Sequence, residues 1–169
     1  MAVDSRPVIG IDPGIANLGI GVVAETREGV RLIEVRLVRT SSAVGAGERL
    51  AELAAEVRGA LERYRPGALV VEAQYFHRQR EAAVKLGMAV GVCLLAAQDA
   101  GVPVVEYGPM AVKQALVGNG RADKAQVAFM VRALLGLRAP PESSHVADAL
   151  ALALTHLQSR RISAATQGG

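Results

Sequence analysis

The stretch PVIGIDPGIANLGIGVV, residues 7–23, decides how this chain folds. Its apolar run at 8–11 indicates a buried strand, and Pro13-Gly14 signals a turn that ends this strand. Asp12 therefore lies at a strand tip, where an ionised carboxylate beside a core is unfavourable without a partner. The position calls for a cation, a hydrogen-bond network or a substrate.

The glycine-rich remainder of that stretch favours a meander over a nucleotide-binding loop. Strand-like segments at 18–24 and 30–38 follow after short turns, so we expect three antiparallel strands. In a dinucleotide-binding fold, the glycine loop after the first strand would open a helix instead. Gly14, Gly19 and Gly21 are accordingly interpreted as turn and close-packing positions.

Composition predicts one domain. The chain has 169 residues, of which 51% are hydrophobic, and this suffices for a single core. We expect a domain over 1–158 and a flexible tail over 159–169. The net charge of +3 is compatible with a polyanionic partner without requiring one.

The features that bear on localisation indicate a soluble, cytoplasmic protein. The single cysteine, Cys93, fits a reducing compartment. Asp4 and Arg6 precede any apolar stretch, so no secretory signal is visible. The apolar run at 86–97 is too short to span a bilayer, and no membrane partner is expected.

Helical periodicity begins at residue 48, and the expected helix closes at Pro66-Gly67. An apolar strand at 68–71 then ends in Glu72, which repeats the arrangement at Asp12. Further expected elements are a helix over 78–100, a strand over 102–107, helices over 110–117 and 123–135, and a last helix, capped by Ser143 or Ser144, that runs through His156.

The second half of the 78–100 helix is apolar on every side. A surface helix buries only one stripe, so this one is expected either deep in the core or between two subunits. We favour the subunit interface.

Three carboxylates and a histidine form the candidate site. Asp12 and Glu72 end two strands, while His145 and Asp148 are three residues apart on one face of the last helix. Each acid alone has a structural explanation, since Asp148 also suits a helix N-terminus. Together they make a set of hard oxygen ligands with one imidazole, which suits Mg²⁺ or Mn²⁺. In two-metal phosphodiester chemistry, one ion helps to activate water and the other stabilises the leaving oxygen.

At this point the sequence resembles the RuvC-type Holliday junction resolvases of the ribonuclease H-like superfamily. The matching segments, in order, are IGIDPG, VVEAQYF, KLGMAVGV, VKQALVGNGRADKAQV and HVADALALALTH. The resemblance implies an α/β fold with a mixed five-stranded sheet flanked by helices on both faces. It also implies a homodimer that makes paired symmetric nicks in four-way junction DNA during recombination and repair, and the apolar 78–100 helix is its expected interface. The cuts would leave 5′-phosphates and 3′-hydroxyls.

The resemblance assigns Asp12, Glu72, His145 and Asp148 to a catalytic site that binds two divalent ions. His145 is the departure, because many members carry aspartate there and others carry histidine. Imidazole is a good Mn²⁺ ligand and a proton acceptor, but a poorer Mg²⁺ partner than carboxylate. His145 is therefore interpreted as a metal ligand or as the group that positions the attacking water, with a capping or supporting role as the alternative.

DNA contacts are predicted from aromatic and basic residues. The position of Tyr75 matches a family aromatic that stacks on an unpaired base, and Phe76 follows it; a core role is the alternative for both rings. Long cations that match basic family positions can neutralise phosphates. The predicted basic contacts are Lys85, Lys113, Arg121 and Lys124, with Arg121 the weakest candidate. The resemblance also suggests a branch-migration motor as a partner.

Three other functions stay open. Actin-like ATPases and sugar kinases begin with a similar acid-and-glycine hairpin but need two such domains, and ATP binding would support them. A ribonuclease H-like nuclease could instead act on RNA or on replication intermediates. A junction-binding module without activity is the third, although the set of acids argues against it.

Overall fold

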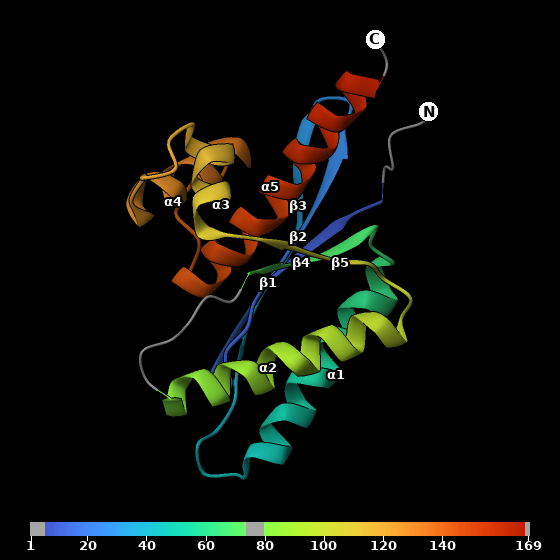
Figure 1. Ribbon diagram of the computed structural model, residues 1–169, viewed down its shortest axis with the longest axis vertical. Coiled ribbons are helices and arrows are strands. Elements are labelled where there is room, and N and C mark those ends of the chain that lie inside the picture. The colour runs from blue at the N-terminus through green and yellow to red at the C-terminus, as the bar shows by residue number, and fades with distance from the viewer. Residues whose placement is uncertain (1–5, 74–79, 168–169) are drawn as a thin grey trace.

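The computed structural model describes residues 6–73 and 80–167, and these form one mixed sheet covered by helices on both faces (Figure 1). The strands are β1 (Val8–Asp12), β2 (Asn17–Thr26), β3 (Gly29–Arg39), β4 (Ala68–Glu72) and β5 (Val104–Tyr107). The helices are α1 (Ala46–Tyr64), α2 (Arg80–Asp99), α3 (Pro109–Val117), α4 (Lys124–Leu134) and α5 (Ser144–Gln167). The expected order of elements is confirmed, with shifts of a few residues at their ends except at the end of α5.

The sheet has the strand order β3-β2-β1-β4-β5. The first three strands pair antiparallel, as the meander predicted, whereas β4 pairs parallel to β1 and β5 pairs parallel to β4. The two parallel pairs need crossover connections, which α1 and α2 supply. As a result, the carboxyl ends of β1 and β4 lie side by side at one edge of the sheet.

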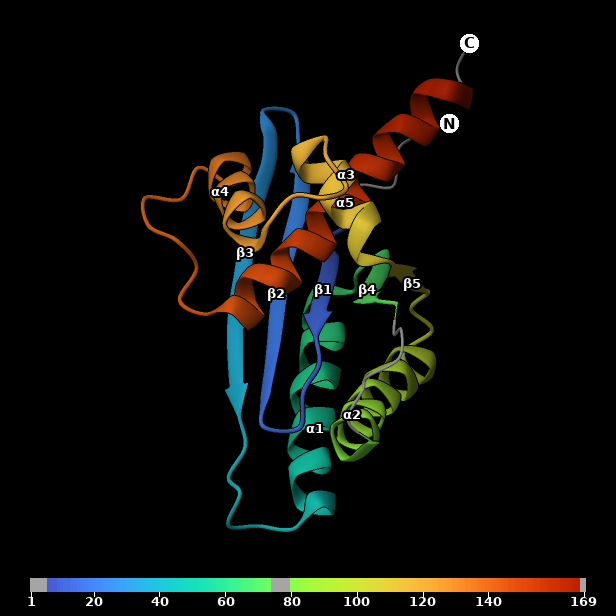
Figure 2. The same cartoon turned by 60° about the vertical axis from the view of Figure 1, so that its left-hand side comes forward.

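Two hydrophobic layers fill the spaces between the sheet and its helices. Alternate residues of the strands, such as Ile9, Ile11 and Leu69, pack under α1 and α2. The other set, which includes Val8 and Val70, packs under α3, α4 and α5. Figure 2 shows α5 crossing the sheet on the face opposite to α1 and α2. Because side chains alternate along a strand, this division fixes which face every strand residue presents.

The last helix is longer than expected. It continues past His156 to Gln167, so the predicted helix end was wrong. No glycine or proline interrupts the chain before Gly168. Arg161 Nε also lies 2.5 Å from Glu25 Oε1, and Arg160 donates to the carbonyl of Arg6 at 3.4 Å. These contacts hold the extension against the β2 end of the sheet, close to the N-terminal strand.

Helix α2 leaves much of its apolar surface exposed. Its buried residues are small (Ala89, Cys93, Ala96 and Ala97), whereas Val84, Met88 and Leu95 are 56%, 44% and 56% exposed. Within the described ranges, α2 is also the one helix whose length and composition would let it cross a membrane, although core helices can pass the same test. The 86–97 run, judged too short by itself, belongs to this longer helix.

Candidate active site

The two strand-end acids point to the same face of the sheet. Asp12 ends β1 and Glu72 ends the adjacent parallel strand β4, with Ile11 and Val71 paired just before them. Each acid is an even number of residues from a strand residue that packs under α5, Asp12 from Val8 and Glu72 from Val70. Parallel pairing and side-chain alternation therefore direct both carboxylates toward the start of α5.

Helix α5 delivers the other two predicted groups. Its first turn is capped by Ser143, whose Oγ accepts a hydrogen bond from the Val146 amide at 3.2 Å. His145 Nδ1 then lies 2.6 Å from Asp12 Oδ2. Asp148, one turn further along, lines a cavity together with Asp12 and Glu72. The structure thus brings all four predicted catalytic residues to one region.

Glycines let the helix come this close. A β-carbon on Gly19, which pairs with Asp12 across the sheet, would stand 2.1 Å from the His145 carbonyl oxygen. One on Gly10 would stand 1.9 Å from the Ala149 carbonyl oxygen, and one on Gly21 would meet Leu150 Cδ2 at 2.7 Å. The interpretation of Gly19 and Gly21 as close-packing positions is confirmed. Gly10 has the same role, and the sequence analysis did not identify it.

The acids line a cavity of about 210 Å³ that has an apolar wall. Lys113 comes from α3 and Lys124 from the start of α4, so two predicted cations face the three carboxylates. The apolar wall, which no local sequence signal predicted, consists of Pro109, Val112, Val127, Ala151 and Leu152. His145 contacts Asp12 but does not line this cavity.

Burial and mutual repulsion raise the pKa values of two of the acids, Asp12 and Glu72. Burial raises the pKa of Asp12, and the charge of Asp148 adds to the rise, while the hydrogen bond to His145 opposes it. Glu72 is more exposed, yet partial burial and then the charges of Asp12 and Asp148 raise its pKa as well. Raised pKa values in a cavity that mixes acids and lysines are typical of functional sites.

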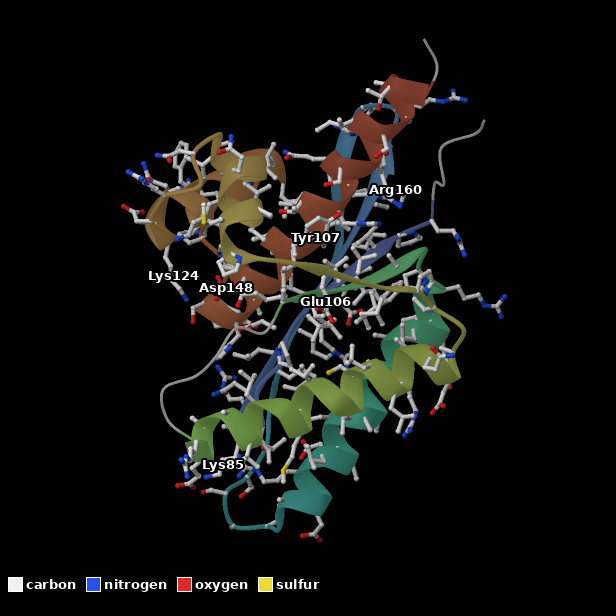
Figure 3. The ribbon with its side chains drawn as sticks, viewed as in Figure 1. Lys85, Glu106, Tyr107, Lys124, Asp148 and Arg160 are labelled. Carbon is white, nitrogen blue, oxygen red and sulfur yellow. The ribbon has the colours of Figure 1, made fainter. Side chains whose placement is uncertain are left out.

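Each of two acids is already paired. Lys124 Nζ lies 3.3 Å from Asp148 Oδ2, and Asp12 is held by His145. Figure 3 shows the Lys124 side chain directed at Asp148. Among the described residues, no three of the His, Cys, Asp and Glu side chains lie close enough together to hold an ion. Ion binding by this set therefore needs side-chain movements that exchange these partners.

The chemistry of the donor set nevertheless fits a divalent ion. Three carboxylates with one imidazole offer hard oxygen ligands and one nitrogen. A cation between them would offset the burial, and then the mutual repulsion, that raise the pKa values of Asp12 and Glu72.

The remaining predicted DNA contacts lie outside this cavity. Arg121 is exposed in the turn between α3 and α4, where its amide bonds to Asn119 Oδ1 at 3.0 Å. Lys85 lies on α2, far from Asp148 in Figure 3, and pairs with Glu81 at 2.6 Å. Tyr75 and Phe76 fall in 74–79, outside the described residues.

Lys85 borders a second hollow, of about 450 Å³. The start of α1 adds Arg49 and the first turn of α2 adds Arg80 to its lining, which also includes Glu81, the partner of Lys85. Arg49 was not among the predicted DNA contacts; it is partly buried, and its Nε donates to Thr40 Oγ1 at 2.9 Å. Only the packing of α1 beside α2 places it near Lys85.

The sheet order, the crossover helices and the acids at adjoining strand ends define a nuclease of the ribonuclease H-like class. A family model described as "Crossover junction endodeoxyribonuclease RuvC" matches residues 8–156. The chain therefore belongs to the RuvC family of crossover junction endodeoxyribonucleases.

Similar proteins agree with this assignment. A RuvC of Thermus thermophilus is 54% identical over 152 residues, covering 88% of this chain and 92% of the relative. That of Rubrobacter xylanophilus is 47% identical over 162 residues, covering 96% and 90%. A solved structure described as T. thermophilus RuvC in complex with Holliday junction substrate has a TM-score of 0.88 and 52% identity, and covers 94% of this chain and 96% of its own.

A more distant structure shares the fold alone. The yeast mitochondrial Holliday junction resolvase is 16% identical, with a TM-score of 0.66 and coverage of 93% and 80%. The two structures together confirm the ribonuclease H-like fold predicted from the sequence. The family model and the close relatives confirm the resolvase family.

Proposed function

We propose that this resolvase cuts four-way DNA junctions by paired symmetric nicks, and that Asp12, Glu72, His145 and Asp148 bind two Mg²⁺ or Mn²⁺ ions for the purpose. The observation that carries the proposal is the convergence of these four side chains from β1, β4 and α5 on one region of a family member. The homologous complex with a Holliday junction substrate supports the choice of DNA.

The chain's own groups have distinct tasks in this mechanism. Divalent ions bound by the acids would lower the pKa of a bound water and neutralise charge at the scissile phosphate. In the metal-free protein, Asp12 holds the imidazole of His145 through Nδ1. With ions bound, the ring would serve either as an ion ligand or as the group that positions the attacking water. In the second case, His145 Nε2 accepts the proton as water attacks phosphorus and the 3′ oxygen leaves.

Basic residues position the DNA. Lys113 and Lys124 lie in the cavity, within reach of a phosphate next to the acids. Lys85 and Arg121 would contact phosphates farther from the scissile bond, since each is outside the cavity. Tyr75 would stack on an unpaired base at the junction centre, with Phe76 beside it. Phosphate contacts position the duplex and do not by themselves read its sequence.

Helix α2 is proposed as the homodimer interface. Val84, Met88 and Leu95 share one helix face, opposite the small residues that pack on α1 and the sheet. A second copy across this face would cover their exposed area and give two active sites for two nicks. Membership in the family implies a soluble protein, which makes a subunit contact the better explanation of this apolar face than a bilayer.

Two further assignments depend on the family resemblance. We place the protein in the cytoplasm, and we assign it a branch-migration motor as a functional partner. The single domain over 1–158 and the mobility of 159–169 likewise stay predictions.

The test uses a synthetic mobile four-way junction, with a matched linear duplex and an RNA–DNA hybrid as competing substrates. Each is incubated with purified protein in Mg²⁺ and in Mn²⁺, and products are mapped on a sequencing gel beside Asp12→Asn. We expect paired symmetric nicks in the junction only, and none with the variant. Preferential cutting of the hybrid would instead support the ribonuclease H-like alternative, and tight binding without nicks would support a binding module.

A further inference from the structure

The ion pair between Lys124 and Asp148 occupies an oxygen that a metal ion would need. Lys124 Nζ lies 3.3 Å from Asp148 Oδ2. The lysine side chain is 83% exposed, so only a weak contact holds it there, whereas the Asp148 side chain is 39% exposed at the cavity. The Lys124 ammonium therefore neutralises the Asp148 carboxylate in the place of a metal ion.

The backbone at Lys124 is held by helix capping, whereas its side chain is largely exposed. Lys124 is the first residue of α4, and the preceding Asp123 caps this helix by accepting from the Gln126 amide at 2.8 Å. Gln126 Oε1 accepts in return from the Asp123 amide at 2.9 Å. This reciprocal capping box anchors the helix start, so the Lys124 ammonium can change partners by side-chain rotation alone.

Lys124 also acts on the other two acids. Its charge opposes the raised pKa of Asp12 and that of Glu72, and for Glu72 it is the larger of the two lysine effects. Lys113 lines the same cavity, but in the described part of the chain it forms no ion pair with a carboxylate. Each lysine thus brings one positive charge to the cavity, but of the two, only Lys124 is paired with a carboxylate among the described residues.

We propose that Lys124 alternates between Asp148 and a DNA phosphate, so that the free protein binds divalent ions weakly and the DNA-bound protein binds them more tightly. The inference rests on the proposed function, because it takes the acids as the ion site. When a phosphate draws the ammonium away, the Asp148 oxygen becomes available to the ion. By linkage, the ion then strengthens DNA binding by the same factor.

Exposed ion pairs set the size of the effect. Such pairs contribute about 0.2–1 kcal/mol, which corresponds to a change in ion affinity of up to roughly fivefold. Removing Lys124 should therefore raise the Mn²⁺ affinity of the DNA-free protein by about 1.4- to fivefold. Lys113→Met removes a charge from the same cavity without breaking an ion pair, so its effect should be smaller.

The experiment measures Mn²⁺ binding by electron paramagnetic resonance for wild type, Lys124→Met, Lys113→Met and Asp12→Asn. Each protein is titrated alone and with a saturating linear duplex, with duplex alone as the blank. We expect the duplex to raise Mn²⁺ affinity more in wild type and in Lys113→Met than in Lys124→Met. Equal affinities of wild type and Lys124→Met in the DNA-free state, or equal gains with duplex, would overturn the inference.

The Asp12→Asn arm separates this inference from the function on which it rests. If Asp12→Asn binds Mn²⁺ as well as wild type does, the acids are not the ion site, and the proposed mechanism fails with the inference. If Asp12→Asn loses Mn²⁺ while Lys124→Met behaves as wild type, only the role of Lys124 is refuted.

Discussion

A single methyl group on Gly19 should disturb the active site without touching any catalytic side chain. Gly19 pairs with Asp12 across β1 and β2, and its missing side chain faces the first turn of α5. In Gly19→Ala the new β-carbon would stand 2.1 Å from the His145 carbonyl oxygen. A carbon–oxygen contact needs roughly 3.3 Å, so the helix start and the sheet must separate by about 1.2 Å.

This displacement has two measurable consequences. Overpacking of this kind costs about 1–3 kcal/mol, which for a chain of this length lowers Tm by roughly 2–12 °C. The displacement also lengthens the 2.6 Å contact between His145 Nδ1 and Asp12 Oδ2. Misplacing catalytic groups by about 1 Å can reduce the rate about 100-fold. We expect both effects in Gly19→Ala.

Thermal unfolding by circular dichroism and single-turnover cleavage of a four-way junction test this reasoning. Gly59→Ala is the matched control, because an added β-carbon at this position of α1 would have no neighbouring atom within 4 Å. It should raise the free energy of unfolding slightly and leave cleavage unchanged. If Gly19→Ala unfolds at the wild-type temperature and cuts at the wild-type rate, the first turn of α5 does not pack directly against Gly19. Lower stability with normal cleavage would refute only the coupling to His145.

Four further predictions follow from the site and from α2. Because burial raises the pKa of Asp12 above 3.8, its ionised form destabilises the metal-free fold; Asp12→Asn should therefore increase the free energy of unfolding at pH 7.5. That gain should shrink as the pH falls toward 3.8, which urea titrations at several pH values would show. His145→Ala should lose cleavage in Mg²⁺ and in Mn²⁺, and full cleavage in both would exclude a role for the imidazole. Tyr75→Ala should bind junctions but cut them poorly, as measured by gel shift and cleavage on one substrate. Leu95→Glu should shift the protein from dimer to monomer in sedimentation, whereas an unchanged dimer would place the interface elsewhere.

The sequence predicted the elements well where the local signals were strong. Pro13-Gly14 and the apolar runs before Asp12 and Glu72 located the strand tips, and helical periodicity located α1. The predicted end of α5 came too early because residues 159–167 are mostly polar, while the contacts that support the extension join it to Glu25 and Arg6, far away in the sequence. Gly10 was missed for a similar reason, since nothing near it announces that Ala149 packs against it.

The sequence by itself determined the chemistry available to this protein: four candidate catalytic side chains, their placement at strand ends and on one helix face, and the family that shares them. Only the tertiary structure decided how these groups meet. Parallel pairing of β1 with β4 brings Asp12 beside Glu72, and glycines in the sheet allow α5 to come near enough for His145 to reach Asp12. The tertiary structure also decided the pairing of Asp148 with Lys124. These residues are 24 positions apart, so their contact depends on how α4 packs against α5, and no local sequence pattern predicts it.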